Sequence, residues 1–426
     1  MTENCFLWRK SFLLTRRAVI TGLGILAPNG NGKDAYWDAL INGRSGIKRI
    51  ASFDPSSFST QIAGEVKDFN PCDYFDPKLV KKSARFCHFG VASTKMAVAD
   101  SGINPSRENS NRYGVCFGTT IGAENDVYEQ QYRKFLEFGP KAVGRYTAPE
   151  VTPHVVTGYI CAELNIRGPN STLSSGCSTG LDVVNWGYSM IKKGEVDVAV
   201  VGCADSTIFP FAISGFSSLG ILSKRNDDPE KASRPYDKDR DGLVASEGGI
   251  SIVVEELNHA LNRDANIYAE IVSYATACEA QDVFHVELSG QTLFSAMKRA
   301  LTTAKVRGDE IDYICAHGNA IPSYDLAETN AFKTFFKDHA YSIPISSIKS
   351  MTGHAFAAAG GFQVVATSLS LKNGIIPPTI NLDVPDPLCD LDYVPHNARY
   401  FSMDTALINT HSVGGTHAVL VLKRFF

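Results

Sequence analysis

Along most of the chain, segments with the hydrophobic pattern of strands alternate with segments that have the hydrophobic pattern of helices. Short apolar runs rich in Val and Ile, such as Ala18–Gly24 and Val196–Cys203, have the length and composition of buried strands. Longer segments such as Ser83–Ser101 and Gln291–Ala304 have apolar residues at the spacing of helices that pack on one face. Because the two kinds of segment alternate, the pattern predicts a layered α/β protein.

The same pattern places the other elements and divides the chain. The charged loop Lys224–Asp241 is the clearest change in composition, and we interpret it as the natural boundary between two halves. We assign residues 1–15 to an N-terminal extension, 16–265 to an N-terminal half and 266–426 to a C-terminal half. Further strands are predicted at Tyr113–Gly118, Ser171–Ser174, Gly249–Glu255, Tyr268–Ala275, Ile311–Ala316, Ile343–Ser347, Ala406–Thr410 and Ala418–Leu422, and further helices at Asp34–Asn42, Cys177–Lys193, Asp325–Lys337 and His354–Leu371.

Composition narrows the class of protein. The chain has 426 residues, of which 44% are hydrophobic and 20% charged, as in ordinary globular proteins. Its net charge of -4 disfavours a general nucleic-acid partner, and no segment approaches the roughly 20 apolar residues of a membrane span. The 10 cysteines form no CxxC pair and no Cys/His set with zinc spacing, so we expect a reducing cytoplasm and no metal.

One cysteine lies in a setting that favours nucleophilic chemistry. In Ser174-Ser-Gly-Cys177-Ser-Thr-Gly180 it follows a predicted strand and begins a predicted helix. Free amides and the helix dipole at that position favour a thiolate, and the small neighbours leave room for a substrate and for oxyanion donors. The other nine cysteines are interpreted as packing residues.

Two histidines occupy comparable turns. His317 comes just after a predicted strand, where α/β proteins place groups that contact ligands. His354 precedes a helix rich in Ala and Gly, and a helix N-terminus disfavours imidazolium. Each alone is compatible with a structural role, but together with Cys177 they indicate a catalytic site.

These residues and their flanking motifs resemble the β-ketoacyl-acyl-carrier-protein synthases, the condensing enzymes of the thiolase-like fold. The similarity extends over nearly all of Arg16 to Phe426. It rests on Val19-Ile-Thr-Gly-Leu-Gly24, Ser175-Gly-Cys177, Ser233-Arg-Pro-Tyr-Asp-Lys-Asp-Arg-Asp-Gly242, Ala316-His-Gly318, Lys349-Ser-Met-Thr-Gly-His354, Pro377-Pro-Thr-Ile-Asn-Leu382, Cys389-Asp-Leu-Asp-Tyr-Val-Pro395 and Gly414-Gly-Thr416.

The resemblance implies an α/β fold of five αβαβα layers, built from two pseudo-duplicated halves. It implies that Cys177 accepts an acyl chain from a carrier protein, and that His317 and His354 assist loss of carbon dioxide from a malonyl thioester. The phosphopantetheine arm belongs to the acyl carrier protein, so no cofactor is expected on this chain. A second catalytic cysteine, as in thiolases, is missing from His411-Ser-Val-Gly-Gly415.

Supporting roles also follow from the resemblance. Lys349, with Asp325 and Glu328, resembles the charged network that fixes the first histidine of the pair. The backbone amides of Cys177 and Val413 resemble the oxyanion hole.

Two motifs depart from the family pattern and bear on the substrate pocket. The family has Gly-Phe-Gly-Gly near its C-terminal end, where this chain has Ser412-Val413-Gly414-Gly415, so a smaller side chain stands at the gate. The hydroxyl residues that bond the pantetheine arm are replaced by Asn319 and Ile321, of which only Asn319 can hydrogen-bond. We therefore expect Asn319, Ile321, Ser412 and Val413 to line the substrate and pantetheine pocket.

The subtype and the partners follow from finer similarities. Ser175-Gly-Cys-Ser-Thr-Gly-Leu-Asp182 and Ser273-Tyr-Ala-Thr-Ala-Cys278 are more similar to the ketosynthase alpha subunit of type II polyketide synthases, which implies a heterodimer with a chain-length-factor homologue. A homodimeric fatty-acid elongation synthase and a non-catalytic scaffold subunit are the alternatives. An acidic carrier protein needs a basic dock, which we place at Lys67, Lys224 and Arg225.

Overall fold

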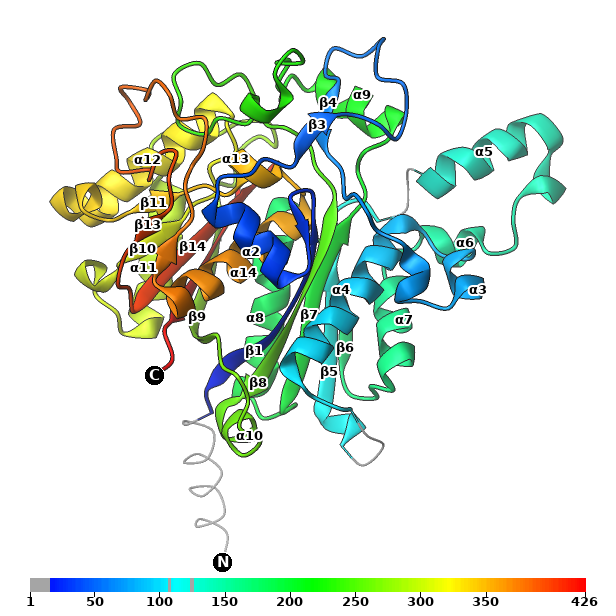
Figure 1. The fold of residues 1–426 in the computed structure, drawn as a ribbon, viewed down its shortest axis with the longest axis horizontal. Coiled ribbons are helices and arrows are strands. Elements are labelled where there is room, and N and C mark those ends of the chain that lie inside the picture. The colour runs from blue at the N-terminus through cyan, green and yellow to red at the C-terminus, as the bar shows by residue number, and fades with distance from the viewer. Residues whose placement is uncertain (1–15, 106–108, 123–125) are drawn as a thin grey trace, which may run out of the picture.

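The computed structural model describes residues 16–105, 109–122 and 126–426 (Figure 1). The predicted extension 1–15 lies outside the described residues. A single 11-stranded sheet runs through the molecule. Its strands are β1 (Ala18–Ala27), β2 (Gly30–Asn31), β5 (Tyr113–Gly118), β6 (Asn170–Leu173), β7 (Val198–Asp205), β8 (Gly248–Glu256), β9 (Ala269–Cys278), β10 (Tyr313–Cys315), β11 (Ile345–Ser346), β14 (Thr405–Ser412) and β15 (Thr416–Lys423).

Helices and two small two-stranded sheets complete the fold. These sheets pair β3 (Ile47–Arg49) with β4 (Ile62–Gly64), and β12 (Ile375–Ile376) with β13 (Arg399–Tyr400). The helices are α2 (Lys33–Ile41), α3 (Pro77–Val80), α4 (Arg85–Ser101), α5 (Asp126–Phe138), α6 (Thr147–Val151), α7 (Val155–Leu164), α8 (Thr179–Lys192), α9 (Pro210–Ser218), α10 (Leu257–Leu261), α11 (Gln291–Ala304), α12 (Pro322–Phe336), α13 (Lys349–Thr352) and α14 (Ala357–Asn373).

The two halves repeat one strand order. The first half runs β6-β5-β7-β8-β1 and the second runs β11-β10-β14-β15-β9, so each has the order 3-2-4-5-1 when its strands are numbered along the chain. The pairing directions also correspond, since β5 and β10 each have two parallel neighbours whereas β8 and β15 are antiparallel to theirs. This repetition confirms the pseudo-duplicated fold. The charged loop 224–241 lies inside the first half, between α9 and β8, and the division at 265/266 falls between α10 and β9.

Helices form the outer and central layers. α4 packs on β1 and β8, α11 packs on β9 and β15, and α8 and α14 lie together between the two parts of the sheet (Figure 1). The central pair approaches closely because Gly180 faces Gly361, where an added Cβ would lie 2.3 Å from a backbone nitrogen. Each central helix follows the third strand of its half, so the turns before α8 and α14 meet at the middle of the molecule.

The apolar pattern explains most of these elements. The predicted strand Tyr113–Gly118 and helix Gln291–Ala304 have the observed bounds. The strand predicted at 311–316 is shorter, because residues 308–310 form a 3-10 turn, and the helix predicted from His354 begins at Ala357. In the described part of the chain, no helix has the length and apolar character needed to span a membrane.

Candidate active site

Cys177 lies at the junction of the two halves. It is in the 3-10 turn Gly176–Ser178, between β6 and α8, so the helix predicted from Cys177 begins at Thr179. Gly176 has φ 63°, a conformation that suits glycine. Ser412, at the end of β14, accepts a hydrogen bond from the Ser178 amide at 2.8 Å and donates one to the Ser175 carbonyl at 2.8 Å. The second half therefore holds the turn that carries the nucleophile.

The Cys177 thiol is protonated at neutral pH. Burial raises its pKa to about 11, although Lys349 and the backbone amides of Val413 and Cys177 act in the opposite direction. The helix start was expected to favour the thiolate, and that expectation was wrong because desolvation outweighs the nearby positive groups. Nucleophilic attack by Cys177 consequently needs a base.

His354 is in position to be that base. Its Nε2 lies 3.0 Å from Cys177 Sγ, within hydrogen-bond reach. Burial, and then Lys349, holds its pKa well below the ordinary value, so the imidazole is neutral. His354 precedes α14 by three residues, and its backbone is fixed by bonds to Val244 and Ser246. His354 is neutral as expected, but the cause is desolvation, whereas the expected cause was the helix dipole.

His317 completes a histidine pair. Its ring centre lies 5.5 Å from that of His354, with the two rings edge to face. Burial lowers its pKa far below the usual range, with Lys349 contributing next. The His411 amide donates to Nδ1 of His317 at 3.3 Å, and Nε2 of the same ring lies 3.2 Å from the side-chain nitrogen of Asn319.

Lys349 and Glu328 both hold the His317 backbone. Lys349 Nζ donates to the His317 carbonyl at 2.6 Å, and burial lowers the pKa of this lysine to about 8. Glu328 accepts the His317 amide at 2.7 Å and the Gly318 amide at 3.0 Å. The turn that carries the imidazole is therefore fixed at three backbone atoms.

Asp325 acts one residue further along the same turn. It accepts the Asn319 amide at 3.0 Å and pairs with Arg240 at 3.3 Å, while burial raises its pKa to about 7. All three residues of the predicted network thus support this turn, each through a different contact.

Several residues of this network were not singled out from the sequence. Tyr236 donates to Glu328 at 2.6 Å, and Gln363 on α14 donates to the carbonyls of Cys315 and Ala316. Asp205, at the end of β7, accepts the amides of Thr120 and Ala357. The signal available in the sequence was a polar residue inside an apolar run, as with Gln363 among the small residues of α14.

The expected pocket residues differ in placement. Val413 forms the turn between β14 and β15, and its side chain is 47% exposed. The backbone amides of Val413 and Cys177 both act on the Cys177 thiol and lower its pKa. Ile321 is half-buried, and Asn319 is buried beside His317. Ser412 does not face a pocket, because its hydroxyl is buried and hydrogen-bonded to the Ser175 carbonyl and the Ser178 amide in the turn that carries Cys177.

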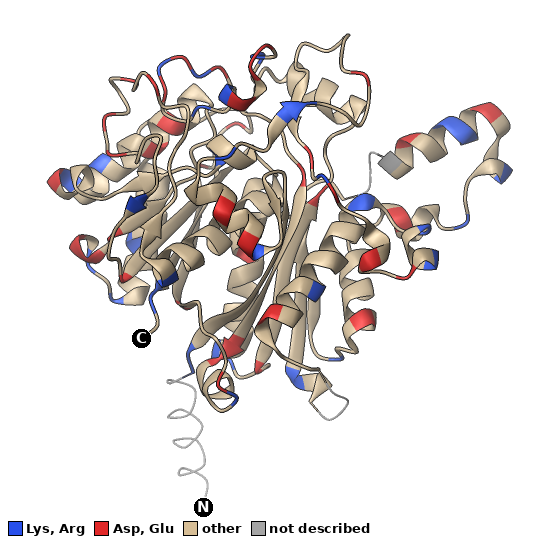
Figure 2. Ribbon diagram, in the orientation of Figure 1, with Lys and Arg blue, Asp and Glu red and all other residues tan. Residues whose placement is uncertain are grey.

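The expected dock residues lie on two different segments of the chain. Lys67 and Lys224 are exposed, and Arg225 donates to the Asp239 carbonyl at 2.6 Å. The segment before Lys67 contacts the segment of Lys224, since Thr60 bonds the Ser223 carbonyl at 2.9 Å. Acidic and basic residues alternate along the loop that follows (Figure 2).

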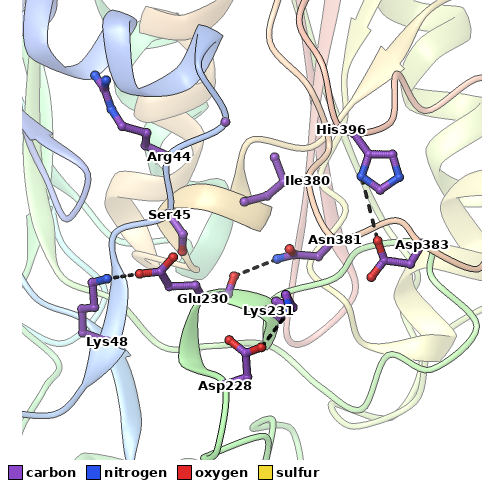
Figure 3. A pocket seen from close by; sticks show the side chains of 11 residues that line it. Arg44, Ser45, Lys48, Asp228, Glu230, Lys231, Ile380, Asn381, Asp383 and His396 are labelled. Carbon is purple, nitrogen blue, oxygen red and sulfur yellow. Dashed lines mark hydrogen bonds and ion pairs between the residues drawn. The ribbon is translucent and has the colours of Figure 1, made fainter.

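A separate surface hollow of about 620 Å³ lies between residues 43–48, 228–231 and 380–396 (Figure 3). Two ion pairs lie within it, Lys48 with Glu230 and Lys231 with Asp228 at 3.0 Å, and the His396 ring lies 3.9 Å from Asp383. Arg44 pairs with Asp38, outside the hollow. None of the predicted site residues lines it. We assign no chemistry to this hollow.

The buried thiol predicts a pH dependence of alkylation. With a pKa of about 11, the thiolate fraction rises about tenfold for each pH unit between pH 7 and 9.5, so the rate of Cys177 labelling by iodoacetamide is expected to rise with that slope. Peptide mass spectrometry measures this rate. A labelling rate that levels off near pH 7 would instead indicate a thiolate–imidazolium pair.

Comparisons with known proteins agree with this geometry. Residues 15–260 match the model of the β-ketoacyl synthase N-terminal domain, and residues 268–383 match that of the C-terminal domain. A 3-oxoacyl-[acyl-carrier-protein] synthase 2 of Coxiella burnetii is 41% identical over 96% of this chain and 99% of its own length. The tetracenomycin polyketide synthase ketoacyl synthase alpha subunit of Streptomyces glaucescens is 38% identical over 96% and 97%.

Solved structures give the same result. One is a type II polyketide synthase acyl-carrier protein in complex with its ketosynthase, bound to the hexaketide. Its matching chain has a TM-score of 0.90 and 30% sequence identity, and the match covers 96% of the present chain and 100% of the matching chain. The ishigamide ketosynthase/chain length factor has a TM-score of 0.89 at 32% identity, with coverage of 96% and 100%.

Proposed function

This chain belongs to the β-ketoacyl synthase family of condensing acyltransferases, and on that premise we propose that it joins a malonyl unit to an acyl or polyketide chain held on Cys177. The observation that carries the proposal is the convergence of one protonated thiol and two neutral imidazoles. Nε2 of His354 lies 3.0 Å from Cys177 Sγ, and the His317 ring is 5.5 Å from that of His354. This arrangement serves acyl transfer and decarboxylation in turn.

In the first step Cys177 takes the acyl chain. Sγ attacks the thioester carbonyl of the acyl carrier protein, and the thiol proton passes to His354 Nε2 and then to the departing phosphopantetheine sulfur. The new bond is S–C to Cys177, and the bond that breaks joins the acyl carbon to the carrier sulfur. The amides of Cys177 and Val413 stabilise the oxyanion in between.

In the second step the two histidines stabilise an enolate. Each imidazole donates a ring N–H to the malonyl thioester oxygen while the bond to the carboxylate breaks and carbon dioxide leaves. His354, whose Nε2 gave up the thiol proton in the first step, does so as the tautomer that carries its single hydrogen on Nε2. The electron pair of that bond becomes the enolate, whose carbon attacks the Cys177 thioester. The Cys177 thiolate departs and takes up one proton from solvent, which restores the thiol and the enzyme.

We further propose that the product is a poly-β-keto chain. Val413 supports this, since a small and half-exposed side chain at the hairpin turn leaves more space beside Cys177 than the phenylalanine of the family. Fatty-acid elongation is the alternative function, and the observation that supports it is the 41% identity to the Coxiella synthase.

Reconstitution distinguishes the two products. The chain is supplied with malonyl-carrier protein and a chain-length-factor homologue, and products are weighed by mass spectrometry. Products extended by several unreduced malonyl units only when the homologue is present support the polyketide role. A single extension by the chain alone would assign fatty-acid elongation, and no acylation or decarboxylation at all would indicate a scaffold subunit.

A partner subunit has a suitable surface on this chain. β6 is the last strand of the sheet, so one of its edges has no neighbour within the described residues. α5 projects from the body (Figure 1) and exposes the apolar side chains of Tyr128, Tyr132, Phe135, Leu136 and Phe138. We propose that a chain-length-factor homologue covers these features in a heterodimer.

The basic dock residues Lys67 and Lys224 are expected to strengthen binding of the acyl-carrier protein. Lys224→Glu or Lys67→Glu is expected to raise KM for acyl-carrier protein by roughly 2- to 5-fold, because an exposed ion pair contributes at most about 1 kcal/mol. Steady-state kinetics measures the change, and iodoacetamide labelling of Cys177 checks that the site is intact. Lys298→Glu, an exposed lysine on α11, is the matched control. Equal KM values for all three variants would rule out this dock.

A further inference from the structure

Three potential metal ligands gather where neighbouring strands end. His411 on β14 and His417 on β15 are directly opposite each other in the antiparallel hairpin. Glu279 follows β9 immediately, and its amide donates to the Gly415 carbonyl at 2.9 Å. Strand pairing therefore brings together residues that are far apart in the sequence.

The ligand atoms converge at a spacing suited to one ion. Glu279 Oε1 lies 2.8 Å from His417 Nε2 and 3.2 Å from His411 Nε2, and the two rings stack with centres 3.9 Å apart. One donor atom from each residue lies within 4.8 Å of the others. Zinc bonds of about 2.0–2.1 Å in tetrahedral geometry separate ligand atoms by roughly 3.3 Å. Small side-chain shifts are enough to reach that geometry.

The three side chains of the cluster are buried, and they include a carboxylate. The side chains of Glu279, His411 and His417 are 1%, 5% and 3% exposed. Glu279 accepts hydrogen bonds from His417 Nε2 at 2.8 Å and from the Glu287 amide at 3.0 Å. Among the residues that the structure describes, no lysine or arginine pairs with it, and His411 Nε2, although 3.2 Å from its carboxylate, makes no hydrogen bond. A buried carboxylate is costly without a compensating charge.

We propose that Glu279, His411 and His417 form a binding site for a divalent cation of the Zn²⁺ class. Two imidazoles and one carboxylate suit zinc, whereas Mg²⁺ and Ca²⁺ prefer oxygen ligands. Three protein ligands leave a fourth position open for water. The site adjoins the histidine pair, because the His411 amide bonds His317. No metal was expected from the sequence, in which no cysteines and histidines lie together at zinc spacing.

Zinc titration of the full chain tests the proposal. Protein stripped with a chelator and dialysed is titrated with ZnCl₂ by calorimetry, and with MgCl₂ in parallel. We expect one Zn²⁺ per chain, no Mg²⁺ binding and a rise in Tm with zinc. Co²⁺ is expected to give the intense visible absorption of a tetrahedral site. A wild-type chain that is folded but takes up no zinc would overturn the proposal.

Variants locate the site. His417→Asn and Glu279→Gln are each expected to weaken zinc binding by roughly 10- to 100-fold or more, with circular dichroism confirming the fold. Cys278→Ser and His285→Asn remove exposed potential ligands beside the cluster and are expected to bind zinc as the wild type does. Unchanged binding in both ligand variants, or loss in either control, would assign the zinc to another place and refute the site.

Discussion

His317→Ala and His354→Ala are each expected to lower the rate of malonyl decarboxylation by roughly 100- to 1000-fold, the usual cost of removing one preorganised donor to a developing oxyanion. Both imidazoles are buried and neutral, and a neutral imidazole keeps one ring N–H that can donate to the malonyl oxygen. Release of labelled carbon dioxide from malonyl-carrier protein measures the rate.

The two variants should differ in acylation of Cys177. His354 Nε2 is 3.0 Å from the sulfur and takes the thiol proton, so His354→Ala slows acylation, whereas His317→Ala leaves it near the wild-type rate. Intact-mass measurements over time separate the two. His154→Ala, at an exposed position before α7, is the control. Undiminished carbon dioxide release in either active-site variant would exclude that histidine from decarboxylation.

Cys177→Ala is expected to abolish condensation, with a loss on the order of 10⁴-fold or more, because no other group can hold the acyl chain. Carbon dioxide release from malonyl-carrier protein should persist within about tenfold, since the two histidines that stabilise the enolate remain in place. Product analysis and carbon dioxide release are followed in the same reaction.

Two controls sharpen this result. Cys278→Ala removes an exposed cysteine and should leave both activities unchanged. Cys177→Ser keeps a side chain of similar size but is a poorer nucleophile at neutral pH, and it should also lose condensation. Condensed product from Cys177→Ala would show that another residue carries the acyl chain.

Local patterns predicted the elements well where one apolar period decides the structure. The bounds of Tyr113–Gly118 and Gln291–Ala304 agree with the structure, where the first is a strand within the sheet and the second is a helix packed on it. No element was predicted for α5, whose apolar side chains are exposed instead of packed in the core. The start of α14 was misplaced because His354 and Ala355 are buried in a turn that continues the apolar pattern.

The sequence indicated the chemical groups of the site better than their environment. Cys177, His317 and His354 are brought together as expected, but the thiol pKa was predicted in the wrong direction because desolvation depends on the whole fold. Ser412 was assigned to the pocket, whereas its hydroxyl braces the turn of Cys177. The cluster of Glu279 with two histidines could not be predicted, since only strand pairing brings its members together.

The most direct test of the central claim follows Cys177 and carbon dioxide together in the wild-type chain. The protein is incubated with acyl-carrier protein and then with malonyl-carrier protein, and the mass of the Cys177 peptide is measured alongside carbon dioxide release. The acyl mass is predicted to appear on Cys177 and then to disappear as one carbon dioxide is released for each β-ketoacyl product. Carbon dioxide and product formed with no acyl group ever present on Cys177 would contradict the account.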